Sequence, residues 1–466
     1  MTRYISTRGA CAPVSFLDAV LAGLAPDGGL YVPETWPTLA PDVLARAATA
    51  PYAETAAAVL QAFAGDDLTS AECDAIAKAA YASGAFPPAV TPLIQTGPGD
   101  WRLDLSLGPS LAFKDVAMQL IAPLYAHALA VRDGRLSVVC ATSGDTGGAA
   151  VEALKNHPRI DLFVLLPEGR VSPVQQRFMT ASGAANVHPV LVAGDFDDCQ
   201  AIVKALFADR AFADQAQLSG VNSINWARIV AQAVYYVVAS EVLSGTPNFA
   251  VPTGNFGDAF AGYVAKRIGA DVGQILIATN ANDILARTLA TGTYQRTGAA
   301  AATLSPAMDI QVASNFERLV FEANGRDAEA TARLYAQFAQ SGTMTLSDAA
   351  MAHIRAGFAA GSADDRATKD AMRSAWRDGA GDMICPHTAV ARAVLAKVGL
   401  AAPVITLATA HAAKFPEAVA DAIGAAPPLP SWCADLFERP ETFTRAANDA
   451  TAIKTLIAQR SRAWRS

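Results

Sequence analysis

Short apolar runs alternate with helical segments through most of this chain, and this alternation constrains the fold more than any other feature. Six runs have the length and apolar character of buried strands. Strands of this kind, separated by helices, form parallel sheets that are covered by helices on both faces. We therefore expect an α/β fold built on parallel sheets. The six expected strands are residues 137–141, 161–166, 187–192, 248–251, 274–278 and 404–407.

The first 95 residues differ from this pattern and form a candidate domain of their own. Residues 1–95 are rich in alanine and have mainly helical periodicity. The stretches Phe86–Pro88 and Thr91–Leu93 mark a boundary, because proline restricts both its own backbone and that of the residue before it. We expect a mainly helical N-terminal domain over 1–95 and a sheet-containing region over 96–466. Within the second region, residues 285–400 give a mixed, largely helical pattern.

Composition and charge exclude several classes of protein. With 466 residues, of which 52% are hydrophobic and 17% charged, the chain is long enough for two or three domains with buried cores. A net charge of −7 argues against nucleic acid or an anionic membrane as the main partner. The longest apolar candidate, Ile229–Leu243, contains Gln232 and Glu241 and falls short of the roughly 18–20 residues of a membrane-spanning helix. We expect no membrane partner.

The cysteines and histidines give no sign of a disulfide framework or a metal centre. The six cysteines include no Cys-x-x-Cys pair, and the six histidines show neither His-x-x-x-His nor His-Glu-x-x-His spacing. Scattered cysteines in a long chain are typical of reduced, packed thiols in a cytoplasmic protein. We therefore expect a cytoplasmic protein without a metal site.

Thr253–Asp258 is the first of two loops that could carry chemistry. It follows an expected strand and opens an expected helix over 259–268, and Gly254 and Gly257 let its backbone N–H groups turn toward one point. Unpaired N–H groups and the positive end of a helix dipole suit a dianionic phosphate. The loop is neither a Walker A loop nor a dinucleotide-binding Gly-x-Gly-x-x-Gly. Taken alone, it fits a phosphate cradle and a plain tight turn equally well.

The second loop, Thr142–Gly148, has the same setting between a strand and a helix. It offers three hydroxyl groups, several N–H groups and one acidic side chain, Asp145. Neutral donors at the start of a helix suit a substrate carboxylate. The alternative is a helix N-cap formed by Ser143 or Asp145, which is favoured for one loop alone. Both loops follow the carboxyl ends of strands, where folds of this class bind their ligands.

Two basic residues complete the set of candidates. Lys114 stands between Phe113 and Asp115 at the start of an amphipathic run, where a lysine is by default a solvated cation that pairs with its neighbour. Arg228 ends the segment Gly220–Arg228, in which three polar side chains precede it. Its planar guanidinium group suits a phosphate or a carboxylate. A capped helix with a surface arginine is the alternative.

These segments occur in one order, and in that order the chain resembles the threonine synthase family. The family consists of fold-type-II enzymes that depend on pyridoxal phosphate (PLP), and the resemblance is to its longer class, which has an N-terminal extension domain. It implies that residues 96–466 form a PLP-binding region of two interleaved α/β domains. The match runs nearly end to end, which makes it more specific than any single loop. The matching segments are Tyr4–Gly9, Ala25–Pro33, Leu111–Asp115, Ala141–Gly147, Asn222–Arg228, Gly254–Asp258, Ser314–Leu319, Pro386–Ala389 and Ala408–His411.

The resemblance assigns roles to most of the candidate residues. It implies that Lys114 is the Schiff-base lysine and the catalytic residue, that Thr409 binds the pyridine nitrogen, and that Asp145 lies near the 3-oxygen of the cofactor. The residues implied to hold the cofactor phosphate are Gly254, Asn255, Phe256, Gly257 and Asp258. Those implied to bind the substrate carboxylate and nearby groups are Thr142, Ser143, Gly144 and Thr146. Those implied to bind the substrate phosphate are Asn222, Ser223 and Arg228.

The implied reaction is the last step of threonine biosynthesis, in which O-phospho-L-homoserine and water give L-threonine and phosphate by γ-elimination and β-addition of water. PLP supplies the electron sink, and Lys114 is the implied base. Two positions depart from the family pattern. Leu107 stands where relatives have the histidine of His-Gly-Pro-Thr, and Ala412 where they have the proline of His-Pro-Ala-Lys-Phe. We expect both to be tolerated, the second as a loop adjustment.

Two alternatives stay open at this point. Another fold-type-II enzyme, such as a serine/threonine dehydratase or an O-acetylserine-type β-replacement enzyme, would share the lysine and the loops. The N-terminal domain and the Asn222–Arg228 segment argue against it, because a substrate without phosphate needs no second anion site. A relative that binds PLP or a phosphorylated ligand without turnover is kept open by Leu107. The sequence does not fix the oligomeric state, and we expect a monomer or a homodimer.

Overall fold

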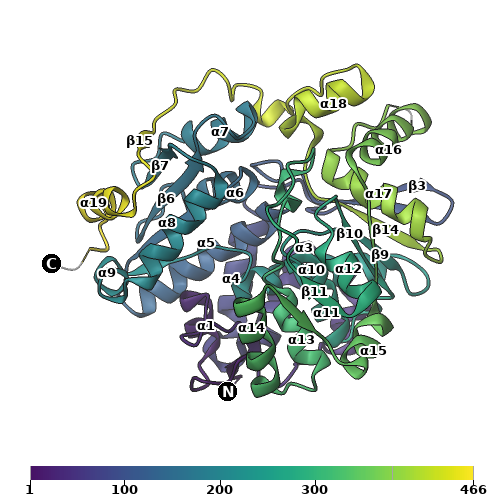
Figure 1. The fold of residues 1–466 in the computed structure, drawn as a ribbon, viewed down its shortest axis with the longest axis horizontal. Helices are drawn as coiled ribbons and strands as arrows, with labels where there is room; N and C mark the ends of the chain where they lie inside the picture. Colours follow the sequence, from purple (N-terminus) through teal and green to yellow (C-terminus); the bar gives the residue numbers. More distant parts are fainter. Residues whose placement is uncertain (1, 380, 465–466) are drawn as a thin grey trace.

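Two mainly parallel sheets lie side by side in Figure 1. The sheet that contains β6 and β7 lies at the upper left, and the sheet that contains β9, β10 and β14 lies at the right. The computed structural model describes residues 2–379 and 381–464. All six expected strands are present, which confirms the α/β fold with parallel sheets. Helices cover both faces of each sheet, as the apolar character of the strands requires.

The larger sheet has six strands in the order β13-β10-β9-β14-β4-β3, and only β3 runs antiparallel to its neighbour. Successive side chains of a strand point to opposite faces. Ala250 and Leu276 therefore pack against Val394 of helix α17 on one face, whereas Phe249 and Ile277 join the main core on the other. The elements are β3 (Leu93–Gly97), β4 (Asp100–Asp104), β9 (Asn248–Pro252), β10 (Ile275–Thr279), β13 (Phe358–Ser362), β14 (Val404–Ala408), α10 (Trp226–Val242), α11 (Gly257–Arg267) and α17 (Pro386–Val398).

The smaller sheet has five parallel strands in the order β15-β7-β6-β5-β8. Val139 and Leu165 pack with helices α8 and α19 on one face, and Val138 and Val164 pack into the main core on the other. The elements are β5 (Leu136–Ala141), β6 (Ile160–Pro167), β7 (Val187–Val192), β8 (Leu218–Ser219), β15 (Thr444–Ala446), α5 (Lys114–Val131), α6 (Asp145–Leu154), α7 (Pro173–Thr180), α8 (Phe196–Ala208), α9 (Arg210–Ala216) and α19 (Ala450–Arg460).

The N-terminal segment packs beneath both sheets, against α5 and α10 (Figure 1). It is mainly helical, as expected, but it also contains a two-stranded antiparallel pair, β1 and β2. Strands of three residues are too short to show an alternating pattern, so the sequence does not reveal them. The elements are β1 (Tyr4–Ser6), α1 (Phe16–Ala22), β2 (Tyr31–Pro33), α2 (Pro41–Ala47), α3 (Tyr52–Ala64), η1 (Gly65–Asp67) and α4 (Ser70–Tyr81).

The segment 285–400 is largely helical, with one further antiparallel pair and an edge strand of the larger sheet. Its elements are α12 (Ile284–Thr291), β11 (Thr293–Gln295), η2 (Pro306–Met308), α13 (Phe316–Ala323), α14 (Ala328–Ser341), β12 (Thr343–Thr345), α15 (Asp348–Gly357) and α16 (Asp365–Asp378). After β14 the chain forms η3 (Ala412–Lys414), α18 (Pro416–Ile423) and η4 (Ser431–Cys433). Among the described residues, no helix is both long and apolar enough to cross a membrane.

Candidate active site

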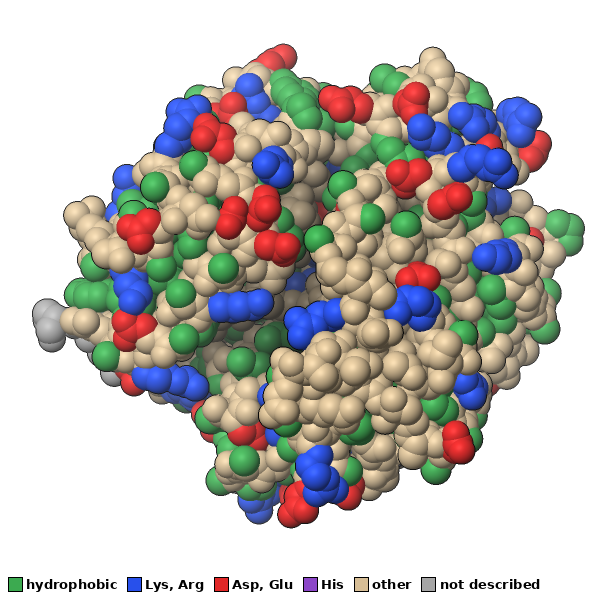
Figure 2. Space-filling model, in the orientation of Figure 1, with side chains coloured by type: hydrophobic (Ala, Val, Ile, Leu, Met, Phe, Trp, Pro, Cys, Tyr) green, Lys and Arg blue, Asp and Glu red, His purple; other side chains and the backbone are tan. Residues whose placement is uncertain are grey.

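A cavity of about 410 Å³ lies where the strands of both sheets end. Figure 2 shows the molecule hollowed between its two lobes, with Lys and Arg side chains along the rim of the hollow. The loops that follow β5, β9 and β14 all reach the cavity, because parallel strands end at the same edge of a sheet. Every residue that the sequence predicted for the site lines this cavity except Gly144.

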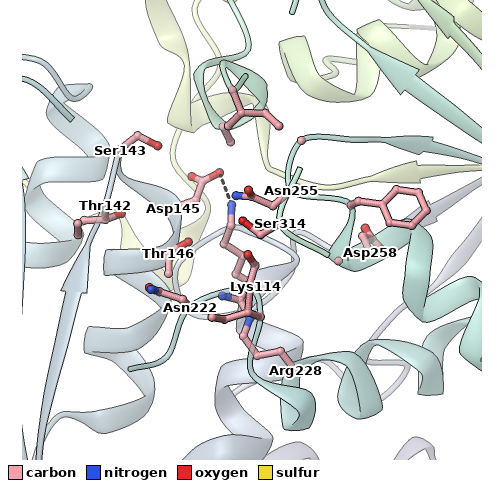
Figure 3. A pocket seen from close by; sticks show the side chains of 18 of the residues that line it. Lys114, Thr142, Ser143, Asp145, Thr146, Asn222, Arg228, Asn255, Asp258 and Ser314 are labelled. Atoms are coloured by element: carbon pink, nitrogen blue, oxygen red, sulfur yellow. Dashed lines mark hydrogen bonds and ion pairs between the residues drawn. The ribbon is translucent and has the colours of Figure 1, made fainter. Parts of the chain in front are cut away.

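Lys114 is the first residue of α5, and it is buried with 9% of its surface exposed. Its Nζ points into the cavity and lies 3.4 Å from Oδ2 of Asp145 (Figure 3). Asp115, the neighbour that a surface lysine would pair with, instead accepts hydrogen bonds from the N–H and hydroxyl groups of Ser110 at 2.8 and 2.7 Å. The alternative of a solvated lysine paired with Asp115 is therefore wrong.

The loop before Lys114 is shaped to present it. Leu111 has a φ of +64°, in the left-handed region that a leucine rarely adopts. The N–H of Phe113 donates to the carbonyl of Thr409 at 2.8 Å, which ties the loop to the end of β14. Burial lowers the pKa of Lys114, and the nearby cation Arg228 lowers it further. The negative charge of Asp145 raises this pKa but does not offset the effect of burial. A lysine with a lowered pKa is more often a neutral amine, the form that is nucleophilic and basic.

Asp145 begins α6 but does not cap it, because the N-cap is Gly144, with a φ of +135° and no capping side chain. The carboxylate is buried, and its Oδ1 accepts from Nε2 of Gln175 at 3.0 Å. Burial opposes its ionisation, but the cations Lys414 and Lys114 outweigh burial and hold the pKa of Asp145 well below its usual range. Asp145 is thus an anion inside the cavity. The N-cap alternative for Asp145 is wrong.

The rest of this loop presents hydroxyl groups to the cavity, on the left of Figure 3. Oγ1 of Thr142 accepts from the N–H groups of Gly144 and Gly147, both at 2.9 Å, which folds the loop tightly. Ser143 and Thr146 also line the cavity. Gly144 does not, since its N–H is used within the loop and a Cβ there would lie 2.4 Å from the side chain of Gln175. Gly144 shapes the loop instead of facing a ligand.

The loop after β9 approaches a neighbouring backbone closely. A Cβ on Gly254 would lie 2.6 Å from the carbonyl oxygen of Ala307, so only glycine fits there. Phe256, the N-cap of α11, has a φ of +65°. Asp258 accepts from the hydroxyl groups of Tyr235 and Tyr236 at 2.6 and 3.0 Å, and burial raises its pKa to about 6. Its Oδ2 has no hydrogen-bond partner among the described residues.

Arg228 is a buried cation without a counter-ion among the described residues. It is 2% exposed, its Nη1 donates to the carbonyl of Val221 at 3.1 Å, and its Nε has no partner in the part of the chain that the structure describes. It forms no ion pair with any described residue, and burial lowers its pKa to about 10. The surface-arginine alternative is therefore wrong. An unpaired buried guanidinium group that lines a cavity is suited to an anionic ligand.

The other polar residues of the Gly220–Arg228 segment divide into two kinds. Asn225 is structural: it caps α10 by accepting from the N–H of Ala227 at 3.0 Å, and it donates to the carbonyl of Val20 at 2.8 Å. Asn222 and Ser223 are more exposed and line the cavity. They therefore remain available to a ligand next to Arg228.

Sequence reasoning gave no role to two buried residues of the site. His387 lines the cavity, and its Nε2 accepts from the N–H of Ala307 at 3.3 Å. Burial lowers the pKa of His387 to about 4, which keeps it neutral. Lys414 lies behind Asp145, with its Nζ 2.8 Å from Oδ1. Both belong to segments noted in the sequence, Pro386–Ala389 and His411–Phe415, but nothing in either segment indicated burial next to Lys114.

Comparison with known proteins agrees with this geometry. Three family models cover the chain: the threonine synthase N terminus over residues 3–81, pyridoxal-phosphate dependent enzymes over 90–409, and the threonine synthase C-terminal region over 388–457. The threonine synthase of Pseudomonas aeruginosa is 44% identical over 98% of both chains, and that of Corynebacterium glutamicum 39% identical over 97% of this chain and 98% of its own.

Solved structures give the same result. PLP-bound threonine synthase from Brucella melitensis is 48% identical, with a TM-score of 0.95 over 99% of this chain and 100% of its own. Yeast threonine synthase is 34% identical, with a TM-score of 0.91 over 98% of both chains. The cofactor is therefore pyridoxal phosphate, and the alternative of another fold-type-II enzyme is excluded. The chain belongs to the threonine synthase family of PLP-dependent lyases.

Proposed function

We propose that this cavity converts O-phospho-L-homoserine and water to L-threonine and phosphate, with Lys114 as the Schiff-base lysine. The observation that supports the proposal is that two positions suited to anions line the same cavity as the buried Lys114. One is the glycine loop at the start of α11, and the other is the unpaired Arg228. A phosphorylated cofactor and a phosphorylated substrate need one position each.

The residues of the cavity fit the cofactor. The close approach of backbone at Gly254, the turn at Phe256 and the N-terminus of α11 together suit its phosphate, which we assign to residues 254–258. Oδ2 of Asp258, which lacks a partner among the described residues, could donate to that phosphate when protonated. The hydroxyl group of Thr409 lines the cavity beside the lysine loop and would bind the pyridine nitrogen, and Asp145 would lie near the 3-oxygen.

When bound, PLP withdraws electrons from the α-carbon of the amino acid and so makes the α-proton removable. Lys114 is placed to accept that proton at Nζ, because it is buried in the cavity and its lowered pKa favours the neutral amine. The same Nζ can return protons to neighbouring carbons of the substrate, since a lysine side chain has four rotatable bonds. Burial of the site keeps bulk water from these transfers.

The loop Thr142–Thr146 would hold the substrate carboxylate. Its hydroxyl groups and the N-terminus of α6 supply neutral donors, which bind an anion without adding a competing counter-ion. Gly144 is the exception among the residues assigned to this role, and we assign to it only the shape of the loop.

Arg228, with Asn222 and Ser223, would hold the substrate phosphate as it leaves the γ-carbon. The guanidinium group is fixed in place before the ligand arrives, because its Nη1 is held by the carbonyl of Val221. A charge positioned in advance, away from water, stabilises a departing anion without the cost of reorganising solvent. This is the physical reason to expect phosphate, and not a smaller neutral group, as the leaving group.

The test is turnover by the PLP-loaded full chain. We expect O-phospho-L-homoserine to yield L-threonine and phosphate in equal amounts. Borohydride reduction followed by peptide mapping should place the cofactor on Lys114. A loaded protein that releases no phosphate would support the alternative of a relative that binds without turnover. Labelling of a different lysine would overturn the assignment of Lys114.

A further inference from the structure

A second buried lysine, Lys414, lies next to Lys114 and takes no part in the proposed binding of cofactor or substrate. Lys414, the last residue of η3, is 0% exposed. Its Nζ donates to the carbonyl of Ser110 at 2.8 Å and pairs with Oδ1 of Asp145 at 2.8 Å. Its backbone carbonyl accepts from the hydroxyl group of Ser172 at 2.9 Å. The side chain is therefore fixed at both ends, in a site where an uncompensated charge would be costly.

Asp145 is shared by the two lysines. Lys414 binds Oδ1 at 2.8 Å, whereas Lys114 approaches Oδ2 only to 3.4 Å. Gln175 adds a hydrogen bond to Oδ1 at 3.0 Å. The shorter distance and the additional donor both lie on the Lys414 side of the carboxylate. The attraction between charges falls with distance, so most of the negative charge is compensated there.

We propose that Lys414 is a positioning residue that compensates the charge of Asp145 and thereby leaves the amine of Lys114 free to react. The proposal rests on the assignment of Lys114 as the Schiff-base lysine. Lys414 touches neither the reacting amine nor a cavity surface, so it acts through Asp145. The ion pair with Lys414 keeps the carboxyl group of Asp145 ionised and holds it in place.

The direction of the effect follows from the charges around Lys114. Asp145 on α6 raises the pKa of Lys114, whereas Lys414 on η3 and Arg228 on α10 lower it. Other titratable groups also face this cluster. They are Asp115 on α5, Asp258 on α11, the neutral His387 on α17 and His411 at the start of η3. Without Lys414, the charge of Asp145 would act on Lys114 alone and hold it as an ammonium ion. Without Asp145, the uncompensated cation of Lys414 would favour the neutral amine.

The test is a charge-balance cycle of four full-length proteins: wild type, K414M, D145N and the double variant K414M/D145N. The readout is the rate at which the cofactor-free chain captures PLP at different pH values, followed by the visible absorption of the product. In this step the neutral amine adds to the aldehyde carbon, and the aldehyde oxygen leaves as water. The ionisation of free PLP is common to all four proteins, so differences between them report on the lysine.

We expect K414M to raise the apparent pKa of capture by roughly one unit or more, and D145N to lower it by a similar amount. The double variant removes one positive and one negative charge, so its apparent pKa should return to within about 0.3 of the wild type. A matched control, K397M at the exposed end of α17, should leave the apparent pKa unchanged. If Lys414 only stabilised the fold, K414M would lower the amount of folded protein. The apparent pKa of capture would then not rise in K414M and fall in D145N.

Circular dichroism will show whether K414M and D145N fold. If only one of them folds, its apparent pKa of capture is compared with that of the double variant, and this comparison is sufficient to test the proposal. Equal pKa values in all folded variants, or shifts of the same sign in K414M and D145N, would overturn the proposal. Peptide mapping after borohydride reduction separates this failure from a failure of the proposed function. If the cofactor is found on Lys414 or on another lysine, the site assignment itself is wrong.

Discussion

Two arginines that are fully buried in the described part of the chain, Arg228 and Arg318, should differ in how much stability their mutation costs. Arg228 has one hydrogen bond and no counter-ion among the described residues, and burial lowers its pKa from the usual value of an arginine to about 10. A difference of that size corresponds to a cost of about 3 kcal/mol for keeping the charge in the folded chain. Replacing Arg228 by methionine removes this cost together with one hydrogen bond worth about 1 kcal/mol. We therefore expect R228M to be as stable as the wild type, or more stable by about 1–2 kcal/mol.

The same substitution should remove most of the activity. Loss of a fixed charge at the departing phosphate typically costs a factor of about 10²–10³ in rate. Phosphate release from O-phospho-L-homoserine measures kcat/KM, and chemical denaturation measures the free energy of unfolding. If R228M loses several kcal/mol of stability, or keeps its kcat/KM, then Arg228 is a structural residue and does not bind the departing phosphate.

Arg318 is the matched control. It is equally buried, but its guanidinium group donates to the carbonyl groups of Tyr31 and Ile224 at 3.0 and 2.6 Å and to the side chain of Asn315. These bonds join the N-terminal segment to the segment that carries Arg228. Burial also lowers the pKa of Arg318, to about 9, so both substitutions remove a costly buried charge. R318M in addition leaves all three acceptors without their donor, so it should be less stable than R228M by roughly 2–5 kcal/mol.

Three further outcomes follow from the geometry. K114A should form no borohydride-stable adduct and should lose turnover by a factor of at least about 10³, as measured by phosphate release. T409V should fold normally, because the Thr409 hydroxyl bonds to no described residue, and should lower kcat by about tenfold, with a changed cofactor absorption band. D258N should change the pH dependence of stability. Burial raises the folded-state pKa of Asp258 to about 6, above its ordinary value of 3.8. The folded chain therefore binds this proton more tightly than the unfolded chain, and the free energy of unfolding falls as the pH rises from about 4 to about 6. The stability of the wild type relative to D258N should thus fall by roughly 2–3 kcal/mol between about pH 4 and pH 6 in denaturation experiments, and a constant difference would contradict this.

The sheets could be predicted because their strands are long, apolar and buried on both faces. Strands such as Ile160–Pro167 are buried at every position and stand out from the helices around them. The pairs β1–β2 and β11–β12 could not be found, since three-residue strands carry no period. The strand Phe358–Ser362 reads Phe-Ala-Ala-Gly-Ser, and small residues give little strand signal.

The lining of the cavity was predictable where one short segment supplies several of its residues, as in Thr142–Thr146 and Gly254–Asp258. The network behind it was not. Lys414 and Asp145 follow strands of different sheets, and only the packing of those sheets brings them to 2.8 Å. The change at Ala412 was expected to be a loop adjustment, and the segment indeed forms a short 3₁₀ helix, but it also delivers the buried Lys414. The expected domain boundary at residue 95, the cytoplasmic location and the monomer or homodimer state stay predictions.

The central claim is that the chain breaks the carbon–oxygen bond of its substrate and adds water at the neighbouring carbon. Turnover of O-phospho-L-homoserine in water enriched in ¹⁸O tests this directly, because the fate of the label depends on which bond is broken. Cleavage of the carbon–oxygen bond predicts one ¹⁸O atom in the hydroxyl group of L-threonine and none in the released phosphate. Label in the phosphate, with homoserine as the other product, would show hydrolysis at phosphorus and would contradict the account.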